Sequence, residues 1–196
     1  MTQARDTLRR SLRRQRRELP AAVRVAAAER LADRLLALPF APTRGAVAGY
    51  WAMDGEIALH AWQLRLPPTL TYCLPVLGDD GRLLFAPWNP GEPLVANRFG
   101  IPEPEADARS LLQAADLALA IVPLVGFDAG CNRLGMGGGW YDRSFAFLNV
   151  DGSAPPPWLV GAGFAVQQVE AIASEPWDVP LHAVCTEART FMAGAT

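Results

Sequence analysis

The segment Asp116-Leu117-Ala118-Leu119-Ala120-Ile121-Val122-Pro123 is a run of apolar residues without polar alternation. Side chains of a β-strand point alternately to the two faces of the sheet, so this run is apolar on both faces. Strands of that kind belong to parallel sheets that are covered by helices on each side. The segment therefore predicts a buried strand of an α/β sheet.

Strand-like and helix-like segments alternate along the rest of the chain. Strands are expected at residues 46–51, 71–76, 83–86, 158–164 and 183–186, and helices at residues 5–19, 21–38, 57–66 and 139–148. Residues 88–106 are rich in Pro, Gly and Glu and are expected to form an ordered loop, and residues 151–157 a proline-rich connection. The alternation predicts one three-layer α/β/α domain over residues 1–196, with a largely parallel, mixed central sheet.

The overall composition argues against several classes of partner. The net charge is −2, so no general field attracts the chain to nucleic acid or to a membrane surface. No apolar run is long enough to span a bilayer, and the basic N-terminus has no hydrophobic stretch behind it, as a secretory signal would. Cys73, Cys131 and Cys185 are far apart and form no CxxC pair, which favours a reducing cytoplasm. We expect a cytoplasmic monomer that binds small molecules.

Basic side chains in this chain are of one kind. All 18 are arginine, so a Walker-type lysine and a Schiff-base lysine are both excluded. His60 and His182 are the only histidines, and neither has a metal-ligand spacing or a partner for a Ser/His/Asp hydrolase. Phosphate chemistry in this protein would therefore depend on arginine and on backbone amides.

A glycine-rich segment follows the strand at residues 116–123. It reads Arg133-Leu134-Gly135-Met136-Gly137-Gly138-Gly139-Trp140-Tyr141-Asp142-Arg143. Backbone N–H groups without neighbouring side chains can turn toward one anion, and a helix that begins near Trp140 would add its N-terminal dipole. The flanking arginines supply positive charge, and Asp142 could hold a divalent metal against a phosphate. The segment indicates a site for a metal–nucleotide complex; the alternative is a flexible surface loop without a ligand.

The segment does not match the common nucleotide motifs. In the dinucleotide fingerprint GxGxxG, Gly135 and Gly137 fit, but Trp140 stands where the third glycine is needed. Cys131 lies beside the segment and could be a nucleophile, but no histidine stands near it in the sequence, and a packing role is the alternative.

The segment does resemble the RLGxGxGYYDR signature of the 5-formyltetrahydrofolate cyclo-ligase family. The resemblance extends over nearly the whole chain and includes the N-terminal arginine helix, residues 50–57 (YWAMDGEI), 97–104 (NRFGIPEP), 123–128 (PLVGFD), 163–167, 177–181 (WDVPL) and Thr186-Glu187. It implies a fold similar to the ribose-5-phosphate isomerase and CoA-transferase-like folds. It also implies that ATP and Mg²⁺ are used to convert 5-formyltetrahydrofolate to 5,10-methenyltetrahydrofolate through a phosphorylated formyl group, with release of ADP and phosphate.

The same resemblance implies roles for individual residues. Catalytic roles fall to Arg133, Tyr141 and Arg143. ATP would contact Arg5, Arg9, Arg133, Leu134, Gly135, Met136, Gly137, Gly138, Gly139, Trp140 and Tyr141. The folate would contact Trp51, Glu56, Met136, Gly137, Gly138, Gly139 and Trp140, and Asp142 and Asp178 would hold Mg²⁺. The family usually has lysine where this chain has Arg5, and Tyr or Phe where it has Trp140, so no proton transfer is assigned to Trp140.

Taken singly, several of these residues have simpler interpretations. Arg5 and Arg9 share a helix stripe with Arg16 and could form only a solvated face. Glu56 could be a surface acid, Asp178 a structural carboxylate and Trp51 a core residue. Two other hypotheses also remain: a sugar-phosphate isomerase or CoA transferase on a related scaffold, and a non-catalytic binder of folate or nucleotide. An isomerase would need a general base near the glycine segment, and a CoA transferase a catalytic glutamate.

Overall fold

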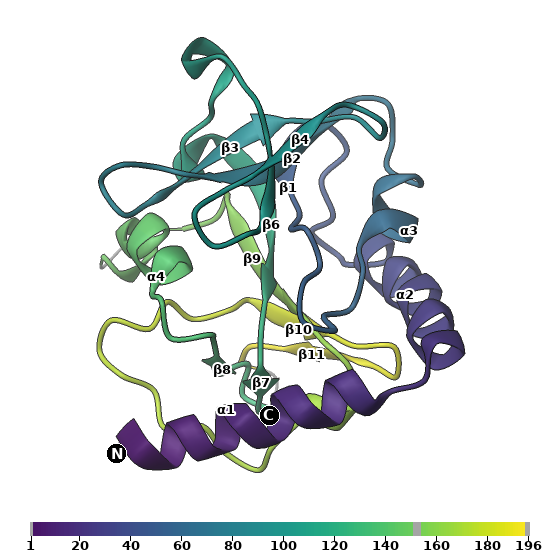
Figure 1. Cartoon of the computed structure of the whole chain (residues 1–196), viewed down its shortest axis with the longest axis vertical. Coiled ribbons are helices and arrows are strands. Elements are labelled where there is room, and N and C mark those ends of the chain that lie inside the picture. The colour runs from purple at the N-terminus through teal and green to yellow at the C-terminus, as the bar shows by residue number, and fades with distance from the viewer. Residues whose placement is uncertain (1, 151–153, 195–196) are drawn as a thin grey trace.

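The structure is a computed structural model that describes residues 2–150 and 154–194 (Figure 1). Its main sheet has the strand order β11-β10-β9-β6-β1-β2-β3. The strands are β1 (Gly45–Ala48), β2 (Leu70–Leu77), β3 (Leu83–Pro87), β6 (Leu117–Pro123), β9 (Trp158–Ala162), β10 (Ala183–Cys185) and β11 (Thr190–Met192). The five inner strands are parallel, and the edge strands β3 and β11 are antiparallel to their neighbours. The predicted largely parallel, mixed sheet is confirmed.

Helices cover both faces of this sheet. On one face, α2 (Ala21–Leu36) and α3 (His60–Gln63) pack on β1, β6 and β9. The buried side chains of α2 recur with helical spacing at Ala27, Leu31 and Leu35, which gives one continuous apolar stripe. On the other face, α4 (Trp140–Ser144) and the 3₁₀ turn η3 (Ala146–Asn149) pack through Phe145. This is the predicted three-layer arrangement.

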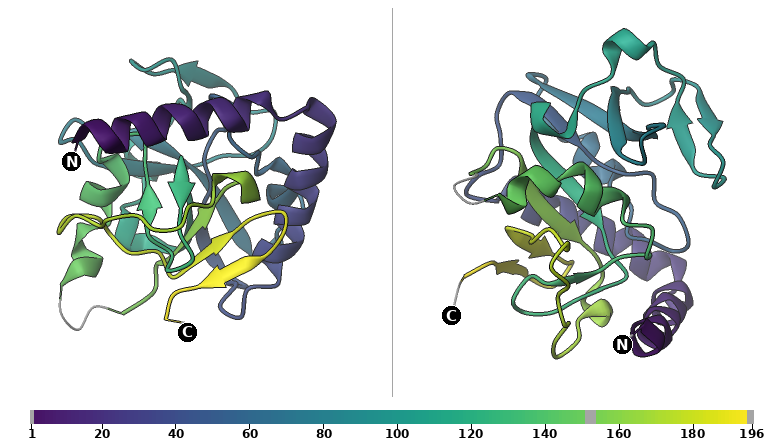
Figure 2. Two further views of the ribbon diagram at one scale, coloured as in Figure 1. Left: turned by 90° about the horizontal axis from the view of Figure 1, so that it is seen from below. Right: turned by 90° about the vertical axis from the view of Figure 1, so that its left-hand side faces the viewer.

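The N-terminal helix lies outside these two layers. α1 (Thr2–Glu18) runs across the end of the sheet where β6 finishes (Figures 1 and 2). Leu12 is buried there against Val125 and Leu134, and Arg16 donates a hydrogen bond to the carbonyl oxygen of Leu124 at 3.2 Å. Parallel strands of α/β sheets place their ligand sites at their carboxyl ends. α1 therefore lies beside the edge where a ligand is expected.

Several sequence-based boundaries are wrong. The helix predicted at residues 57–66 is reduced to α3, because Ile57 and Leu59 are buried in the irregular segment that precedes it, and the Ile57 carbonyl accepts a hydrogen bond from Tyr50. The helix predicted at residues 139–148 is divided at the buried Phe145 into α4 and η3. Residues 88–106 are not a loop throughout, since β4 (Leu94–Ala96) and β5 (Pro102–Pro104) form an antiparallel pair.

Short strands account for the other differences. β7 (Gly126–Phe127) and β8 (Arg133–Leu134) pair with each other and β11 extends the main sheet, and none of the three was predicted. Of the connection predicted at residues 151–157, positions 151–153 lie outside the described residues. No helix within residues 2–150 and 154–194 is long and apolar enough to cross a membrane.

Candidate active site

A cavity of about 720 Å³ opens at the carboxyl ends of the parallel strands. Its walls come from α1, the segment after β1, the end of β6 and the glycine-rich segment before α4. Of the predicted site residues, it is lined by Arg5, Arg9, Trp51, Glu56, Arg133, Gly135, Met136, Gly137, Gly138, Gly139, Trp140, Tyr141, Asp142 and Asp178. The segments that follow β1 and β6 therefore face one cavity.

Two predicted site residues are not part of the cavity lining. Leu134 is fully buried in the core beneath the glycine segment, packed with Leu12 and Val125. Arg143 donates to the carbonyl oxygens of Gly81 at 2.8 Å and Gly138 at 2.9 Å. Arg143 thus contacts the glycine segment from outside the cavity lining, and its predicted catalytic role stays a prediction. The side chain of Leu134 has a packing role.

The glycine segment has a backbone that only glycine adopts readily. Gly137 has φ +95° and Gly139 has φ +66°, both in the left-handed region. Gly139 caps α4, and its carbonyl accepts from the amide of Arg143 at 3.0 Å. With the sharp turn made by glycines, the wall between Gly135 and Gly139 is mostly bare backbone. Such a wall lets an anion approach the peptide N–H groups.

Two arginines at this end of the cavity have buried donors without a partner. Arg133 is buried and forms an ion pair with Asp142, and Arg5 pairs with Asp178 at 3.3 Å and Glu175 at 3.4 Å. Within residues 2–150 and 154–194, Nε of Arg5 and Nε of Arg133 are buried and have no hydrogen-bond partner. A buried unpaired donor is costly, so both guanidiniums keep a donor that could be satisfied if the side chain turned toward a ligand.

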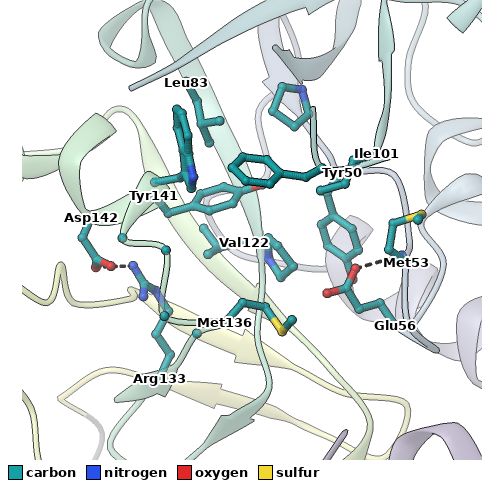
Figure 3. Close-up of a pocket in the computed structure, with 18 of the residues that line it drawn as sticks. Tyr50, Met53, Glu56, Leu83, Ile101, Val122, Arg133, Met136, Tyr141 and Asp142 are labelled. Atoms are coloured by element: carbon teal, nitrogen blue, oxygen red, sulfur yellow. Dashed lines mark hydrogen bonds and ion pairs between the residues drawn. The ribbon is translucent and has the colours of Figure 1, made fainter. Parts of the chain in front are cut away.

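The opposite end of the cavity is mostly apolar and holds the carboxylates of Glu56 and Asp54, and Figure 3 shows Glu56 there. Glu56 lies with Tyr50 and Met53, away from the Arg133–Asp142 pair, and its Oε2 accepts from the Met53 amide at 3.0 Å. Burial raises the pKa of Glu56, although the Met53 amide and the Arg16 guanidinium oppose this. Burial also raises the pKa of Tyr141, whose phenol therefore stays protonated at neutral pH.

The lining includes residues that the sequence did not single out. They are Asp6, Tyr50, Met53, Asp54, Pro75, Leu77, Leu83, Asn97, Phe99, Ile101, Val122, Pro123, Glu175 and Trp177. Phe99 comes from the β4–β5 hairpin, and its ring centroid lies 6.1 Å from that of Trp140. The family-like segment at residues 97–104 was a usable signal for this hairpin, whereas nothing in the local sequence marks Leu83.

The donor set suits a metal that arrives with its ligand. Asp142 and Asp178 both line the cavity, and carboxylates are preferred by hard cations such as Mg²⁺. In the described part of the chain, no group of three or more His, Cys, Asp or Glu side chains is placed to hold a metal. Mg²⁺ at phosphate sites commonly takes one or two carboxylates and completes its shell with phosphate oxygens and water. Two carboxylates fit that mode of binding.

Cys131, considered above as a nucleophile, and the two histidines are not part of the cavity lining. Cys131 is buried in the core on the α4 side of the sheet, and burial raises its thiol pKa, as is usual for a packing cysteine. His182 accepts a hydrogen bond from the Leu159 amide at 2.9 Å, and burial lowers its pKa. Neither His182 nor His60 is part of the cavity lining. The packing interpretation of Cys131 is therefore the one that the structure supports.

Comparison with known proteins agrees with this geometry. Residues 1–187 match the model of the 5-formyltetrahydrofolate cyclo-ligase family. A 5-formyltetrahydrofolate cyclo-ligase of Haemophilus influenzae is 36% identical over 183 residues, which cover 92% of this chain and 96% of that protein. The corresponding protein of Escherichia coli K12 is 35% identical over 184 residues, covering 92% and 98%.

A solved structure has the same fold. The NMR structure of Aquifex aeolicus 5,10-methenyltetrahydrofolate synthetase superposes with a TM-score of 0.80 at 25% identity, covering 98% of this chain and 94% of that one. The sequence signature, the two-ended cavity and the match over residues 1–187 thus converge on one conclusion: this chain belongs to the 5-formyltetrahydrofolate cyclo-ligase family.

Proposed function

We propose that this protein converts 5-formyltetrahydrofolate to 5,10-methenyltetrahydrofolate, consuming ATP with Mg²⁺ and releasing ADP and phosphate. One observation carries the proposal beyond family membership. A single cavity joins an end rich in arginine and bare amides to a mostly apolar end that holds the carboxylates of Glu56 and Asp54. The first end suits a triphosphate and the second a flat heterocycle that donates N–H groups.

The chemistry requires charge neutralisation and alignment more than proton transfer. A formyl oxygen is a poor leaving group until it carries the γ-phosphoryl group of ATP, which gives an iminium phosphate at N5. N10 then attacks the same carbon and loses its proton to water, the five-membered ring closes and phosphate leaves. Arginines and fixed peptide dipoles stabilise such phosphoryl transfer, so a histidine or lysine in the cavity is not required.

We assign the triphosphate to the arginine end. Arg133 would bind it through the buried Nε that lacks a partner, and the amides of Gly135 to Gly139 would surround it. Arg5 and Arg9 would reach it from α1. Tyr141 would donate a hydrogen bond from its phenol, because its raised pKa keeps the proton in place. Arg143 would position the glycine segment without touching the phosphates.

Asp142 and Asp178 would hold Mg²⁺, which when bound supplies positive charge against the phosphate oxygens. In the ligand-free cavity, Asp142 is paired with Arg133 and Asp178 with Arg5. Both pairs would exchange partners when the nucleotide enters: each guanidinium would turn to phosphate and each carboxylate to the metal. The four charges would then remain compensated throughout binding.

We assign the folate to the apolar end. Glu56 would accept hydrogen bonds from the amino group and ring N–H of the pterin with its two oxygens. Trp51 and Trp140 offer flat faces, and Met136 a polarizable chain that adapts to the ring. The formyl group would then point toward the arginine end.

We further propose that residues 1–196 act as one domain and as a cytoplasmic monomer. In support, the cavity draws on segments from Arg5 to Asp178, and Cys73, Cys131 and Cys185 are all buried and unpaired. Sedimentation of the purified protein checks the monomer.

The test is direct. The protein is incubated with 5-formyltetrahydrofolate, ATP and Mg²⁺, and the near-ultraviolet band of the methenyl product is followed. We expect product only when both substrates and the metal are present. Folate binding without product would indicate a non-catalytic binder, and failure to bind either substrate would favour the isomerase or transferase hypothesis.

A further inference from the structure

Arg16 is the largest fully buried side chain of the described residues. Removal of a guanidinium from water is costly and is tolerated when every donor finds an acceptor. Its Nε donates to the Asp54 carbonyl at 3.0 Å, Nη1 donates to the Leu124 carbonyl at 3.2 Å, and Nη2 donates to Asp54 Oδ2 at 3.0 Å. Nη2 also lies 3.6 Å from Oε1 of Glu56.

These contacts fix the segment that carries Glu56. Asp54 lies in the turn after β1, and Leu124 directly follows β6, so Arg16 ties the ends of two neighbouring strands to α1. Glu56 is then held through both oxygens, by Arg16 at Oε1 and by the Met53 amide at Oε2. The carboxylate faces the cavity with little freedom to rotate.

Arg16 is also the cation closest to Glu56. The charged and titratable groups that face Glu56 are Arg13 and Arg16 from α1, Asp54 from its own turn, Tyr50 from the end of β1 and Tyr141 from α4. Arg13 forms its ion pair with Asp54 at 2.7 Å, and Arg17 pairs with Asp54 at 3.3 Å. In the described part of the chain, the ion pair of Glu56 is with Arg16.

We infer that Arg16 is a positioning residue for folate recognition, which orients Glu56 and keeps it as a carboxylate for the pterin N–H groups. The inference rests on the proposed function, since it assigns Glu56 to the folate. Burial disfavours the ionised form of Glu56, and the Arg16 charge opposes that effect. Loss of Arg16 would therefore raise the Glu56 pKa further and favour its protonated form.

The experiment measures KM for 5-formyltetrahydrofolate and for ATP between pH 5.5 and pH 8.5 in Arg16→Met. We expect the folate KM to rise most at the acidic end of this range and to recover as the pH increases, because protonated Glu56 cannot accept both pterin N–H groups. The ATP KM should change less than about twofold, since Arg16 lies beside the folate carboxylate. Arg14→Gln removes an exposed cation of α1 that pairs with Glu18 on the helix surface and is the matched control, with wild-type profiles expected.

Two further variants separate positioning from general damage. Glu56→Gln removes the titrating group, so Arg16→Met added to Glu56→Gln should not raise the folate KM further. Arg16→Lys keeps a cation but loses the forked donors of the guanidinium. We expect its folate KM to change in the same direction as in Arg16→Met, but by less. If Arg16→Met does not fold, Arg16→Lys carries the test. A rise in folate KM that is independent of pH, or equal for both substrates, would overturn the inference.

The proposed function itself is judged on the wild-type protein. If the wild-type protein forms the methenyl product and the Arg16 variants have the wild-type pH dependence of the folate KM, the positioning role of Arg16 is refuted and the proposed function stands. If wild type neither binds 5-formyltetrahydrofolate in calorimetry nor forms product, the proposed function fails.

Discussion

Arg9 on α1 donates from Nε to the carbonyl oxygen of Gly135 at 2.9 Å, across 126 residues of sequence. The same guanidinium pairs with Asp6 one turn earlier at 2.6 Å. The contact joins the N-terminal helix to the first glycine of the segment that bends around the cavity. α1 therefore forms part of the cavity wall and is not only a solvated helix on the surface.

Replacement of Arg9 by alanine should weaken nucleotide binding selectively. We expect the KM for ATP to rise by about tenfold, because one charge-assisted contact is lost, while the KM for folate changes little. Arg10→Ala is the matched control, since Arg10 is exposed and contacts Thr7 of its own helix. Steady-state kinetics with each substrate varied in turn measures both. The opposite pattern would assign the helix to the folate end.

The Asp142 carboxylate should be needed for the metal-bound nucleotide. Asp142→Asn keeps the size of the side chain but removes the charge that pairs with Arg133. We expect kcat/KM for ATP to fall by about a hundredfold and the Mg²⁺ requirement to move to higher concentrations. Asp33→Asn, on the outside of α2, should have no effect, since Asp33 pairs with Arg65 at the surface. Unchanged ATP affinity and rate would remove Asp142 from the site.

The pattern of apolar residues along the chain predicted the layers of this fold well, but it predicted helix boundaries and short strands poorly. The run at residues 116–123 became β6 almost residue for residue, because a strand buried on both faces has no polar alternation to obscure it. The helix expected at residues 57–66 is present only as α3, since Ile57 and Leu59 are buried in the core before the helix begins at His60. β4 and β5 are three residues each and bordered by Pro and Gly, so local propensity could not distinguish them from a loop.

The sequence likewise predicted some residues of the candidate site and missed others. The resemblance was needed to assign Glu56 and Asp178 to the site, because each has an unremarkable local sequence, whereas the glycine-rich segment itself indicated Asp142; all three line the cavity. The resemblance did not show that Arg143, unlike its neighbours, lies outside the cavity lining, because a linear signature does not tell which side chains face inward. The buried position of Arg16 was hidden for another reason. Its partners Asp54 and Leu124 lie 38 and 108 residues away, and no pattern within α1 reports them.

Phe99 on the β4–β5 hairpin should contribute to folate binding. The ring lines the cavity beside Trp140, and the Arg98 guanidinium lies 5.3 Å from its centroid. Phe99→Ala should raise the folate KM about fivefold, equivalent to about 1 kcal/mol of aromatic contact, with the ATP KM unchanged. Val95→Ala, on the same hairpin outside the cavity lining, serves as the control. Equal effects of the two variants on folate KM would contradict the contact.

Asp54 should contribute stability that depends on pH. Burial opposes its ionisation, but hydrogen bonds from Arg13 and Arg16 outweigh this and lower its pKa. Since the folded pKa lies below the unfolded value of about 3.9, the stabilisation is present above about pH 4 and is lost as the pH falls through the folded pKa. Asp54→Asn should cost about 3 kcal/mol at pH 7, because the buried Arg16 loses an ion pair.

The same variant preserves the backbone. Asp54 has φ +52°, a conformation that asparagine tolerates, so the substitution isolates the charge. Urea unfolding at pH 7, 5 and 3.5 measures the effect. The difference in unfolding free energy between wild type and Asp54→Asn should narrow at the lowest pH. A difference that stays constant over this range would show that the Asp54 charge is not responsible.

Two glycines of the same segment should respond differently to alanine. At Gly137, an added Cβ would lie 3.7 Å from Arg9, which is ordinary contact, but φ is +95°, so alanine there is strained by about 1 to 3 kcal/mol. At Gly135, the nearest atom would be Arg133 Nη1 at 3.9 Å, and φ is not in the left-handed region. Gly137→Ala should therefore lower the melting temperature of the ligand-free protein, whereas Gly135→Ala should leave it unchanged.

The ATP kinetics of the two glycine variants test where the phosphates bind. In Gly135→Ala, a methyl group would occupy the bare wall that we assign to the phosphates, so the KM for ATP should rise although the free protein is as stable as wild type. Thermal unfolding without ligand and ATP kinetics on the same two samples measure both quantities. A Gly135→Ala protein with wild-type ATP kinetics would mean that the phosphates do not pass over this part of the backbone, and the nucleotide would have to lie against α1 instead.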